Sequence, residues 1–425
     1  MTMNKRTIYS WALYDWANSA YATTVMAGFF PVFFKSYWSS DLPATESTFY
    51  LGLANSIASL FIVLLAPILG AIADCGGKKK GLLILFAFIG ILNTALLGIV
   101  EQGDWELALL IYIGATLGFS GSIIFNDALI MDVAPESKLD RISALGYALG
   151  YAGGGLLFLC NVLMYTQPHW FSLASGVEAV KVSYFTVSVW WLIFSIPLIL
   201  YVKENKTPAK VSSSNYIVGG FKQLVKTFKE IRSLKVVFTF LLGYWLYIDG
   251  VDTVIRMALD YGISLGMNSS DLIVALLITQ FVGFPAALMY GFLGERLGVK
   301  NGLYIGIMIY LFVIVWAYQM TSIKEFYALA AIVGMVQGGM QALSRSLYAR
   351  IIPINKSAEF FGFYNMIGKF AAVIGPFMMG SIALMTGSVR QAILSISVLF
   401  ILGLWFLIKT NIEEGMAKAR ELEQY

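Results

Sequence analysis

The sequence predicts an all-α membrane protein in which twelve transmembrane helices form two homologous six-helix bundles. Of the 425 residues, 58% are hydrophobic and 13% are charged, whereas a soluble globular chain carries about 25% charged residues. Twelve apolar runs are close to, or longer than, the roughly 20 residues that a helix needs to cross a bilayer. One pattern of glycines and charges also occurs twice, once in each half of the chain. These observations exclude a disordered, fibrous or disulfide-rich secreted protein.

The predicted spans are apolar runs bounded by charged or turn residues. The first run is expected to be a span and not a signal peptide, because its apolar stretch is too long and contains Asp15 and Asn18. In order, the expected spans cover roughly 9–34, 49–73, 81–100, 105–131, 142–165, 182–202, 236–262, 270–294, 302–320, 325–349, 358–387 and 389–410.

Lysine and arginine set the expected orientation, because short cytoplasmic loops carry an excess of them. The chain has 29 such residues, and most of them fall in the loops and termini on one side of the predicted bundle. The loops on the other side carry Lys35, Lys181, Lys324 and Arg390. We therefore expect an integral, multi-pass protein with both termini in the cytoplasm.

The segment 203–235 is the one long internal loop, and it divides the spans six and six. We expect an N-terminal six-helix bundle over 1–202, a cytoplasmic linker over 203–235 and a C-terminal six-helix bundle over 236–425. Within the linker, apolar residues recur at helical spacing from Phe221 to Ile231, and lysines fill the opposite face. The pattern fits an amphipathic helix in the membrane interface, and it also fits a solvated linker helix.

A short loop of the first half recurs in the second half. Both copies place two glycines, an acid and a lysine in the same order between two spans, and a glycine in a later span keeps the same offset of 221 positions. Five matches at one offset indicate two bundles related by an axis along the membrane normal. The matched pairs are Gly70 and Gly291, Asp74 and Glu295, Gly77 and Gly298, Lys79 and Lys300, and Gly154 and Gly375.

The first copy of this loop, from Gly70 to Lys79, resembles the signature of the major facilitator superfamily between its second and third helices. The stretches Trp11–Ser19, Asn126–Ala128 and Gly338–Ser346 resemble a narrower branch, which includes the autophagy-linked vacuolar amino-acid effluxers and their bacterial relatives. The resemblance covers essentially the whole chain and implies a solute transporter in a bacterial inner membrane. Tyr151 stands where the antiporters of the superfamily usually have a proline.

The resemblance implies that the loop between the second and third spans is a cytoplasmic gate. Asp74 would accept hydrogen bonds from the N-terminus of the eleventh helix near residues 357–360, where the helix dipole favours an anion. The alternative is a tight turn whose glycines reverse the chain and whose lysines only set topology. The expected gating residues are Gly70, Asp74, Gly77, Lys79, Glu295 and Gly298.

The seventh span carries ionisable residues, which are costly in a bilayer unless they are paired or hydrated. Asp249, Asp252 and Arg256 are spaced to share one helix face. Asp252 and Arg256 can pair at i,i+4, which leaves Asp249 as a candidate proton or cation carrier. The alternative is a static pair of Asp and Arg near the outer mouth.

Acidic and basic side chains of the two halves are expected to face each other. Asp15, Asp127 and Arg345 stand on the first, fourth and tenth spans, which line the central cavity in the superfamily that the chain resembles. The alternatives are an ion pair that closes the inner vestibule, an Arg345 anchor for a substrate carboxylate, and local packing. Asn18 and Lys369 complete the expected substrate or proton pathway.

The leading functional hypothesis is secondary-active transport of a small polar solute by alternating access. An amino acid or related zwitterion is the first candidate, with a proton or cation as the coupling ion, because the expected cavity carries both signs of charge. The alternatives are a lipid or lysolipid transporter, and a membrane receptor or scaffold that moves no solute.

No enzyme activity, cofactor or metal site is expected. The chain lacks a phosphate-binding loop of the ATPase type and has a single histidine, His169, without cysteines at metal-binding spacing. We expect a monomer in the lipid bilayer that binds a small molecule and no nucleic acid.

Overall fold

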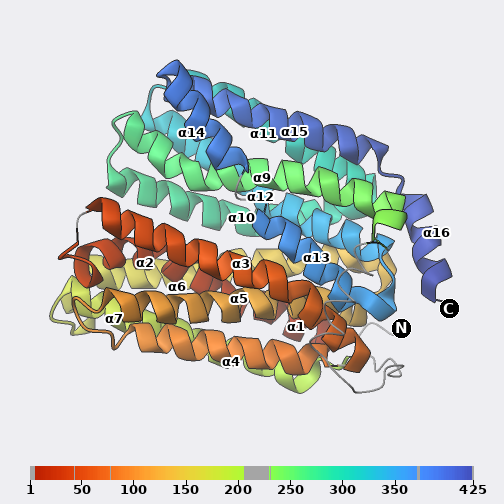
Figure 1. The fold of residues 1–425 in the computed structure, drawn as a ribbon, viewed down its shortest axis with the longest axis horizontal. Helices are drawn as coiled ribbons and strands as arrows, with labels where there is room; N and C mark the ends of the chain where they lie inside the picture. Colours follow the sequence, from red (N-terminus) through yellow and green to blue (C-terminus); the bar gives the residue numbers. More distant parts are fainter. Residues whose placement is uncertain are drawn as a thin grey trace.

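A computed structural model describes residues 5–42, 44–76, 78–204, 229, 231–370 and 374–423. The described residues form helices and connecting turns, and the long helices run side by side (Figure 1). Helices α1 to α7 occupy the lower part of Figure 1, α9 to α12, α14 and α15 occupy the upper part, and α13 runs from the middle toward the lower right. Both chain ends lie at the right of this view, and we call that end of the molecule the terminal face.

The elements follow the predicted order of spans. The N-terminal half contains α1 (Lys5–Ala20), the π-helical η1 (Tyr21–Phe29), α2 (Phe30–Phe33), the π-helical η2 (Phe34–Trp38), α3 (Ala44–Gly76), α4 (Lys79–Leu97), α5 (Trp105–Val133), the 3₁₀ turn η3 (Glu136–Lys138), α6 (Leu139–Thr166), the 3₁₀ turn η4 (Pro168–Phe171) and α7 (Gly176–Tyr201). The C-terminal half contains α9 (Lys235–Ser264), α10 (Ser269–Leu297), α11 (Val299–Gln319), α12 (Ile323–Ile351), the 3₁₀ turn η5 (Ile354–Lys356), α13 (Ser357–Phe370), α14 (Ile374–Thr386), α15 (Val389–Lys409) and α16 (Ile412–Glu423).

Ten helices of the described residues are long and apolar enough to cross a membrane. The first predicted span adds a helical run from Lys5 to Trp38, in which π-helical turns interrupt the α-helix. Pro31 lies between the two π-helical stretches, and proline lacks an amide donor and disturbs the helix one turn earlier. The eleventh predicted span corresponds to α13 and α14, which flank residues 371–373. The predicted linker helix, from Phe221 to Ile231, falls almost entirely outside the described residues.

Serine caps begin three helices at the end of the molecule away from the terminal face. Ser175 accepts a hydrogen bond from the amide of Glu178 at the start of α7, and Ser388 does the same for Gln391 at the start of α15. Ser322 and Glu325 form a reciprocal capping box at the start of α12. Each cap satisfies amides that have no partner within their own helix.

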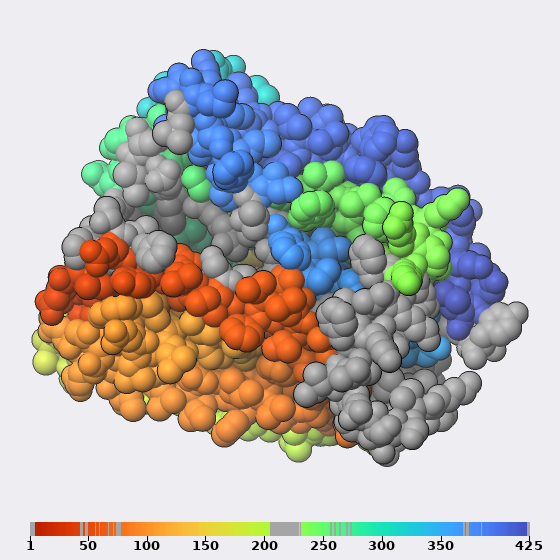
Figure 2. Space-filling view, in the orientation of Figure 1, coloured from red at the N-terminus to blue at the C-terminus, as the bar shows by residue number. Residues whose placement is uncertain are grey.

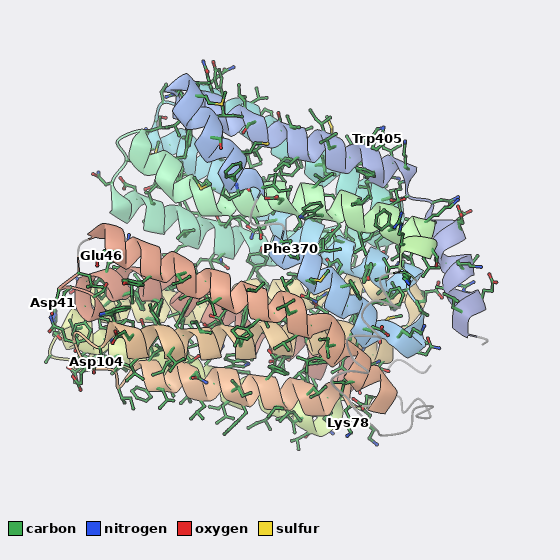
Figure 3. The ribbon with its side chains drawn as sticks, viewed as in Figure 1. Asp41, Glu46, Lys78, Asp104, Phe370 and Trp405 are labelled. Atoms are coloured by element: carbon green, nitrogen blue, oxygen red, sulfur yellow. The ribbon has the colours of Figure 1, made fainter. Side chains whose placement is uncertain are left out.

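The two halves meet along two seams. At one seam α3 and α5 pack against α13, and at the other α6 packs against α10 and α12. In the space-filling view the N-terminal half and the C-terminal half lie on opposite sides of the molecule (Figure 2). Figure 3 places Asp41, Glu46 and Asp104 at the far end of the N-terminal half, and Lys78 toward the terminal face.

Candidate functional site

Arg345 of α12 forms ion pairs with two acids of the other half inside the bundle. Its Nη1 lies 3.0 Å from Asp127 Oδ1 of α5 and 3.5 Å from Asp15 Oδ2 of α1. The Arg345 side chain is 2% exposed. The three ionisable groups therefore meet at a contact between the halves that is shielded from solvent.

The remaining donors of Arg345 bind α6. Its Nε donates to Ser143 Oγ at 2.9 Å, and its Nη2 donates to the Ser143 carbonyl at 2.8 Å. The guanidinium carbon also lies 5.0 Å from the Trp11 ring centre and 4.4 Å from the Tyr147 ring centre. Such cation–π contacts add stabilisation where water is excluded. Ser143 and Tyr147 were not singled out by the sequence, since neutral polar residues and aromatics are common in spans.

Amide side chains hold both acids in place. Asn126 Nδ2 donates to Asp15 Oδ1 at 3.0 Å, and Asn365 Nδ2 donates to Asp127 Oδ2 at 3.1 Å. Gly146 makes room for the acids, because a Cβ there would collide with the Asp15 carboxylate. We call this set of residues the central cluster: Asp15, Asn126, Asp127, Ser143, Arg345 and Asn365.

Asn18 does not join the central cluster. It is 3% exposed, and its Nδ2 has no hydrogen-bond partner. It lies one turn after Tyr14, which is itself fully buried in the N-terminal half. The structure thus brings Asp15, Asp127 and Arg345 together and sets Asn18 apart from them.

Lys79 connects the two halves near the terminal face. Its Nζ donates to Asp132 Oδ2 of α5 at 3.3 Å and to Ser357 Oγ of α13 at 2.7 Å, and the residue is 5% exposed. One turn of α3 nearby approaches α13 so closely that a Cβ on Gly70 would collide with the backbone of Ala358. Gly77 and the side chain of Asp74 lie outside the described residues.

The second copy of the loop is arranged differently. Lys300 stays within its own half, where its Nζ donates to the carbonyls of Ile408 and Thr410 at 2.9 and 2.8 Å. Gly298 has φ +85°, a conformation that favours glycine, and Glu295 is exposed. Among the described residues, the lysine of the first copy therefore lies between the halves, whereas the lysine of the second copy does not.

An acid of α6 makes the corresponding contact between the halves on the other seam. Asp140 Oδ2 lies 2.9 Å from Arg350 Nη2, and Asp140 Oδ1 accepts a hydrogen bond from Ser346 Oγ at 2.6 Å. A Cβ on Gly291 of α10 would lie 2.7 Å from the Ala144 Cβ. Each seam thus combines a glycine at a close approach between helices with a charged contact.

Asp249 of α9 is fully buried and lies apart from the central cluster. Its Oδ1 accepts hydrogen bonds from the Gly375 amide at 3.0 Å and from Thr253 Oγ1 at 3.3 Å. Its Oδ2 has no partner. Asp252, one turn further on, is half-buried. The side chains of Arg256 and Lys369 lie outside the described residues, so the pairing of Arg256 with Asp252 and the place of Lys369 in the pathway remain predictions.

Comparisons with known proteins identify the family of this arrangement. The family model "Vacuole effluxer Atg22 like" matches residues 42–139 and 131–420. The MFS-type transporter YxiO of Bacillus subtilis is 41% identical over 400 residues, which cover 94% of this chain and 93% of YxiO. Autophagy-related protein 22 of Eremothecium gossypii is 23% identical and covers 99% of this chain, with 94% of its own length matched.

Solved structures show the same fold at low sequence identity. The human organic anion transporter MFSD10 superimposes with a TM-score of 0.75 at 14% identity, over 95% of this chain and 99% of its own. The proton:xylose symporter XylE gives a TM-score of 0.70 at 14% identity, over 97% of both chains. These matches confirm the predicted all-helical major facilitator fold over almost the whole length. The chain is a multi-pass membrane transporter, not an enzyme, and it belongs to the Atg22-like family of the major facilitator superfamily.

Proposed function

We propose that this secondary transporter moves an amino acid or a related small zwitterion by alternating access, with the central cluster as the element that closes its pathway. The ion pair of Arg345 with Asp127 and Asp15 carries the proposal, because it links the two halves inside the bundle. Alternating access requires the halves to separate around a central site. An ion pair between the halves exists only while they are together.

The hydrogen bonds of Arg345 favour an ion pair over a substrate anchor. Nε and Nη2 of Arg345 donate to Ser143, and Nη1 donates to Asp127 and Asp15. All three acceptor residues belong to the N-terminal half. A substrate carboxylate would have to displace these acceptors. Removing one partner of such a buried pair leaves an uncompensated buried charge, at a cost of about 3–5 kcal/mol, so the closed conformation depends on the presence of both partners.

The proposed orientation places the terminal face in the cytoplasm of a bacterial cell. The lysine and arginine bias of the loops supports it. The moving units are residues 1–202 and 236–425, joined by 203–235, in a protein that acts as a monomer. In this conformation Lys79, Asp132 and Ser357 join the halves at the terminal face, together with the close approach of Gly70 to α13. Gly77, Glu295 and Gly298 are proposed to shape the two loops, and Asp74 to assist the same closure.

The substrate proposal depends on the family and on the charges of the site. The family model is named for a vacuole effluxer, and the central cluster offers two acids and one base. An ammonium group can replace the arginine as a partner of Asp15 or Asp127, so a zwitterion suits the opened cluster. Asp252, Arg256 and Lys369 are proposed to line the same pathway from the C-terminal half.

A ligand screen followed by transport tests the proposal. Amino acids, amines, carboxylates and lysolipids are added to the purified protein in detergent, and the thermal midpoint is recorded. A ligand at 100 times its Kd stabilises the folded state by about 2.7 kcal/mol, which is a clear shift. We expect an amino acid to stabilise the protein and to exchange across proteoliposomes. Stabilisation by lysolipids alone would favour lipid transport, and absence of any solute movement would contradict the proposal.

A further inference from the structure

The C-terminal half contains a nearly apolar cavity between α9, α10, α11, α12, α14 and α15. The cavity lies toward the end of the molecule away from the terminal face, where α12 begins (Figure 1). Phe326 and Leu329, in the first two turns of α12, form part of its wall. The cavity volume is about 90 Å³, several times the roughly 10–15 Å³ that one water molecule needs. The cavity therefore has room for a group larger than water.

The hydroxyl groups in the cavity wall already donate to backbone carbonyls. Tyr261 Oη donates to the carbonyl of Ala317 at 2.6 Å, and Thr279 Oγ1 donates to the carbonyl of Ala275 at 3.0 Å. Apart from Gln337, the other described residues of the wall have apolar side chains. A water molecule occupies a cavity only where several polar groups bind it. This cavity therefore favours an apolar occupant.

Gln337 of α12 gives the cavity one unsatisfied polar atom. Its side chain is part of the wall, and its Oε1 is buried without a hydrogen-bond partner among the described residues. A buried amide oxygen without a donor is costly, and a ligand that supplies the donor removes this cost. The cavity is therefore suited to an apolar group that carries one hydrogen-bond donor.

The wall that carries Gln337 is held in place by close packing of two helices. Gly334 lies one turn before Gln337 on α12, and a Cβ on it would lie 2.8 Å from the carbonyl oxygen of Thr279 on α10. Thr279 Oγ1 also donates to the carbonyl of Ala330 on α12 at 3.2 Å. These contacts fix the distance between α10 and α12 beside the cavity, so Gln337 has a defined position in its wall.

Two helices connect the cavity with the proposed pathway. Gln337 precedes Arg345 of the central cluster by eight residues on α12, which is about 12 Å along a helix. On α9, Ile255 lines the cavity one turn after Asp252, which is proposed to line the pathway. A solute whose charged groups lie at the opened central cluster can therefore extend its side chain toward the cavity.

We propose that the cavity binds the apolar side chain of the transported solute, and that Gln337 accepts a hydrogen bond from a single donor at the end of that side chain. Phenol and indole rings have this chemistry. A charged side chain would be uncompensated among the apolar groups of the wall, and a plain hydrocarbon would leave Gln337 Oε1 without a donor. The inference rests on the proposed transport function and specifies the class of its substrate.

The first arm of the test examines the cavity without transport. p-Cresol and toluene share a ring and a methyl group, and p-cresol adds one hydroxyl donor. Their dissociation constants are obtained from the thermal midpoint of the purified protein at increasing probe concentration. Gln337→Met keeps the length of the side chain and removes the acceptor. We expect it to weaken p-cresol binding about fivefold, the usual effect of one hydrogen bond, and to leave toluene binding unchanged.

Two further variants make this arm specific. Gln341→Met is the matched control, because Gln341 lies one turn further along α12 and is not among the described residues of the wall. It should retain both affinities. Ala330→Leu fills part of the cavity and should weaken both probes. Equal p-cresol affinity in the wild type and Gln337→Met, or probe binding that Ala330→Leu leaves unchanged, would overturn the proposal.

The second arm measures exchange in proteoliposomes with L-tyrosine and L-phenylalanine, which differ by one hydroxyl group. Gln337→Met should raise the KM for tyrosine about fivefold and leave the KM for phenylalanine and both maximal rates unchanged. p-Cresol should inhibit tyrosine exchange competitively in the wild type.

The outcomes of the second arm separate this inference from the proposed function. An unchanged KM for tyrosine in Gln337→Met, or non-competitive inhibition by p-cresol, would overturn the assignment of the cavity to the solute and leave the proposed function intact. If the wild type moves no solute at all, the proposed function fails, and the substrate assignment fails with it. The probe measurements then still decide whether Gln337 binds a donor inside the cavity.

Discussion

Arg345 Nη1 and Asp127 Oδ1 lie 3.0 Å apart, although they belong to α12 and α5 and are 218 positions apart in the chain. Each residue is also held by a side chain of the opposite half, Arg345 by Ser143 and Asp127 by Asn365. The geometry of the pair is therefore fixed while the two halves are together. A charge-assisted contact of this kind is strong where water is excluded, and it is lost completely when the halves separate.

Arg345→Gln is expected to abolish transport without preventing folding. The change removes the partner of two buried acids and should lower the stability of the closed conformation by about 3–5 kcal/mol, but it leaves no large void. Size-exclusion chromatography should show a monodisperse protein, and uptake into proteoliposomes should be lost. Adding Asp127→Asn should restore part of the uptake, because it removes one unpaired acid. Normal uptake by the single variant would exclude a role for the ion pair.

Gly70→Ala is expected to disfavour closure at the terminal face. Its Cβ would collide with the backbone of Ala358, and a backbone atom cannot move aside as a flexible side chain does. The protein should shift toward an open terminal face, which faster cysteine labelling there would report. Gly52→Ala, on the same helix with nothing within 4 Å of its added Cβ, is the matched control. Equal labelling of the two variants would show that this approach of α3 to α13 does not gate the pathway.

Lys79→Met is also expected to disfavour closure at the terminal face, because it removes a buried positive charge that lies between the halves. It leaves the buried Asp132 without the Nζ that lies 3.3 Å from it, and Ser357 without its donor. The neighbouring Lys78 is exposed, so Lys78→Met should leave the thermal midpoint unchanged. Lys79→Met should lower it by several degrees. A midpoint equal to that of Lys78→Met would mean that Lys79 only sets topology.

Arg420→Gln is expected to have little effect. Nη2 of Arg420, in α16, donates to both carboxylate oxygens of Glu136 in the other half, at 2.9 and 3.1 Å, but both side chains are about half exposed. Exposed ion pairs contribute about 0–1 kcal/mol. Uptake should stay within twofold of the wild type, which makes this variant a control for Arg345→Gln. A loss of transport as severe as that of Arg345→Gln would assign α16 a part in closing the terminal face.

The sequence predicted which ionisable residues lie in the spans and, with the family resemblance, which helices carry them to the centre. It did not predict that Ser143 and Asn365 bind these ionisable residues, because a neutral polar side chain in a span usually serves an ordinary contact between helices.

The loop pattern that recurs at an offset of 221 positions indicates that the two halves are homologous, but it does not predict which contacts each copy makes. Lys79 and Lys300 occupy matching positions, yet Lys79 binds across the halves and Lys300 binds the carbonyls at the end of α15. The difference arises because different helices lie next to each loop, and the sequence of the loop itself does not specify those neighbours. Similarly, the match of Gly154 and Gly375 gave no indication that one packs against Ser19 and the other against Asp249.

The most direct test of the central claim measures a distance across the terminal face. Spin labels are placed at Ser137 and Ile354, which are exposed and belong to different halves, in a background where Cys75 and Cys160 are replaced by serine. Double electron–electron resonance should give a short distance for the wild type and a large additional population at longer distance for Arg345→Gln. Identical distance distributions in the two proteins would contradict the claim that the Arg345–Asp127 pair keeps the terminal face closed.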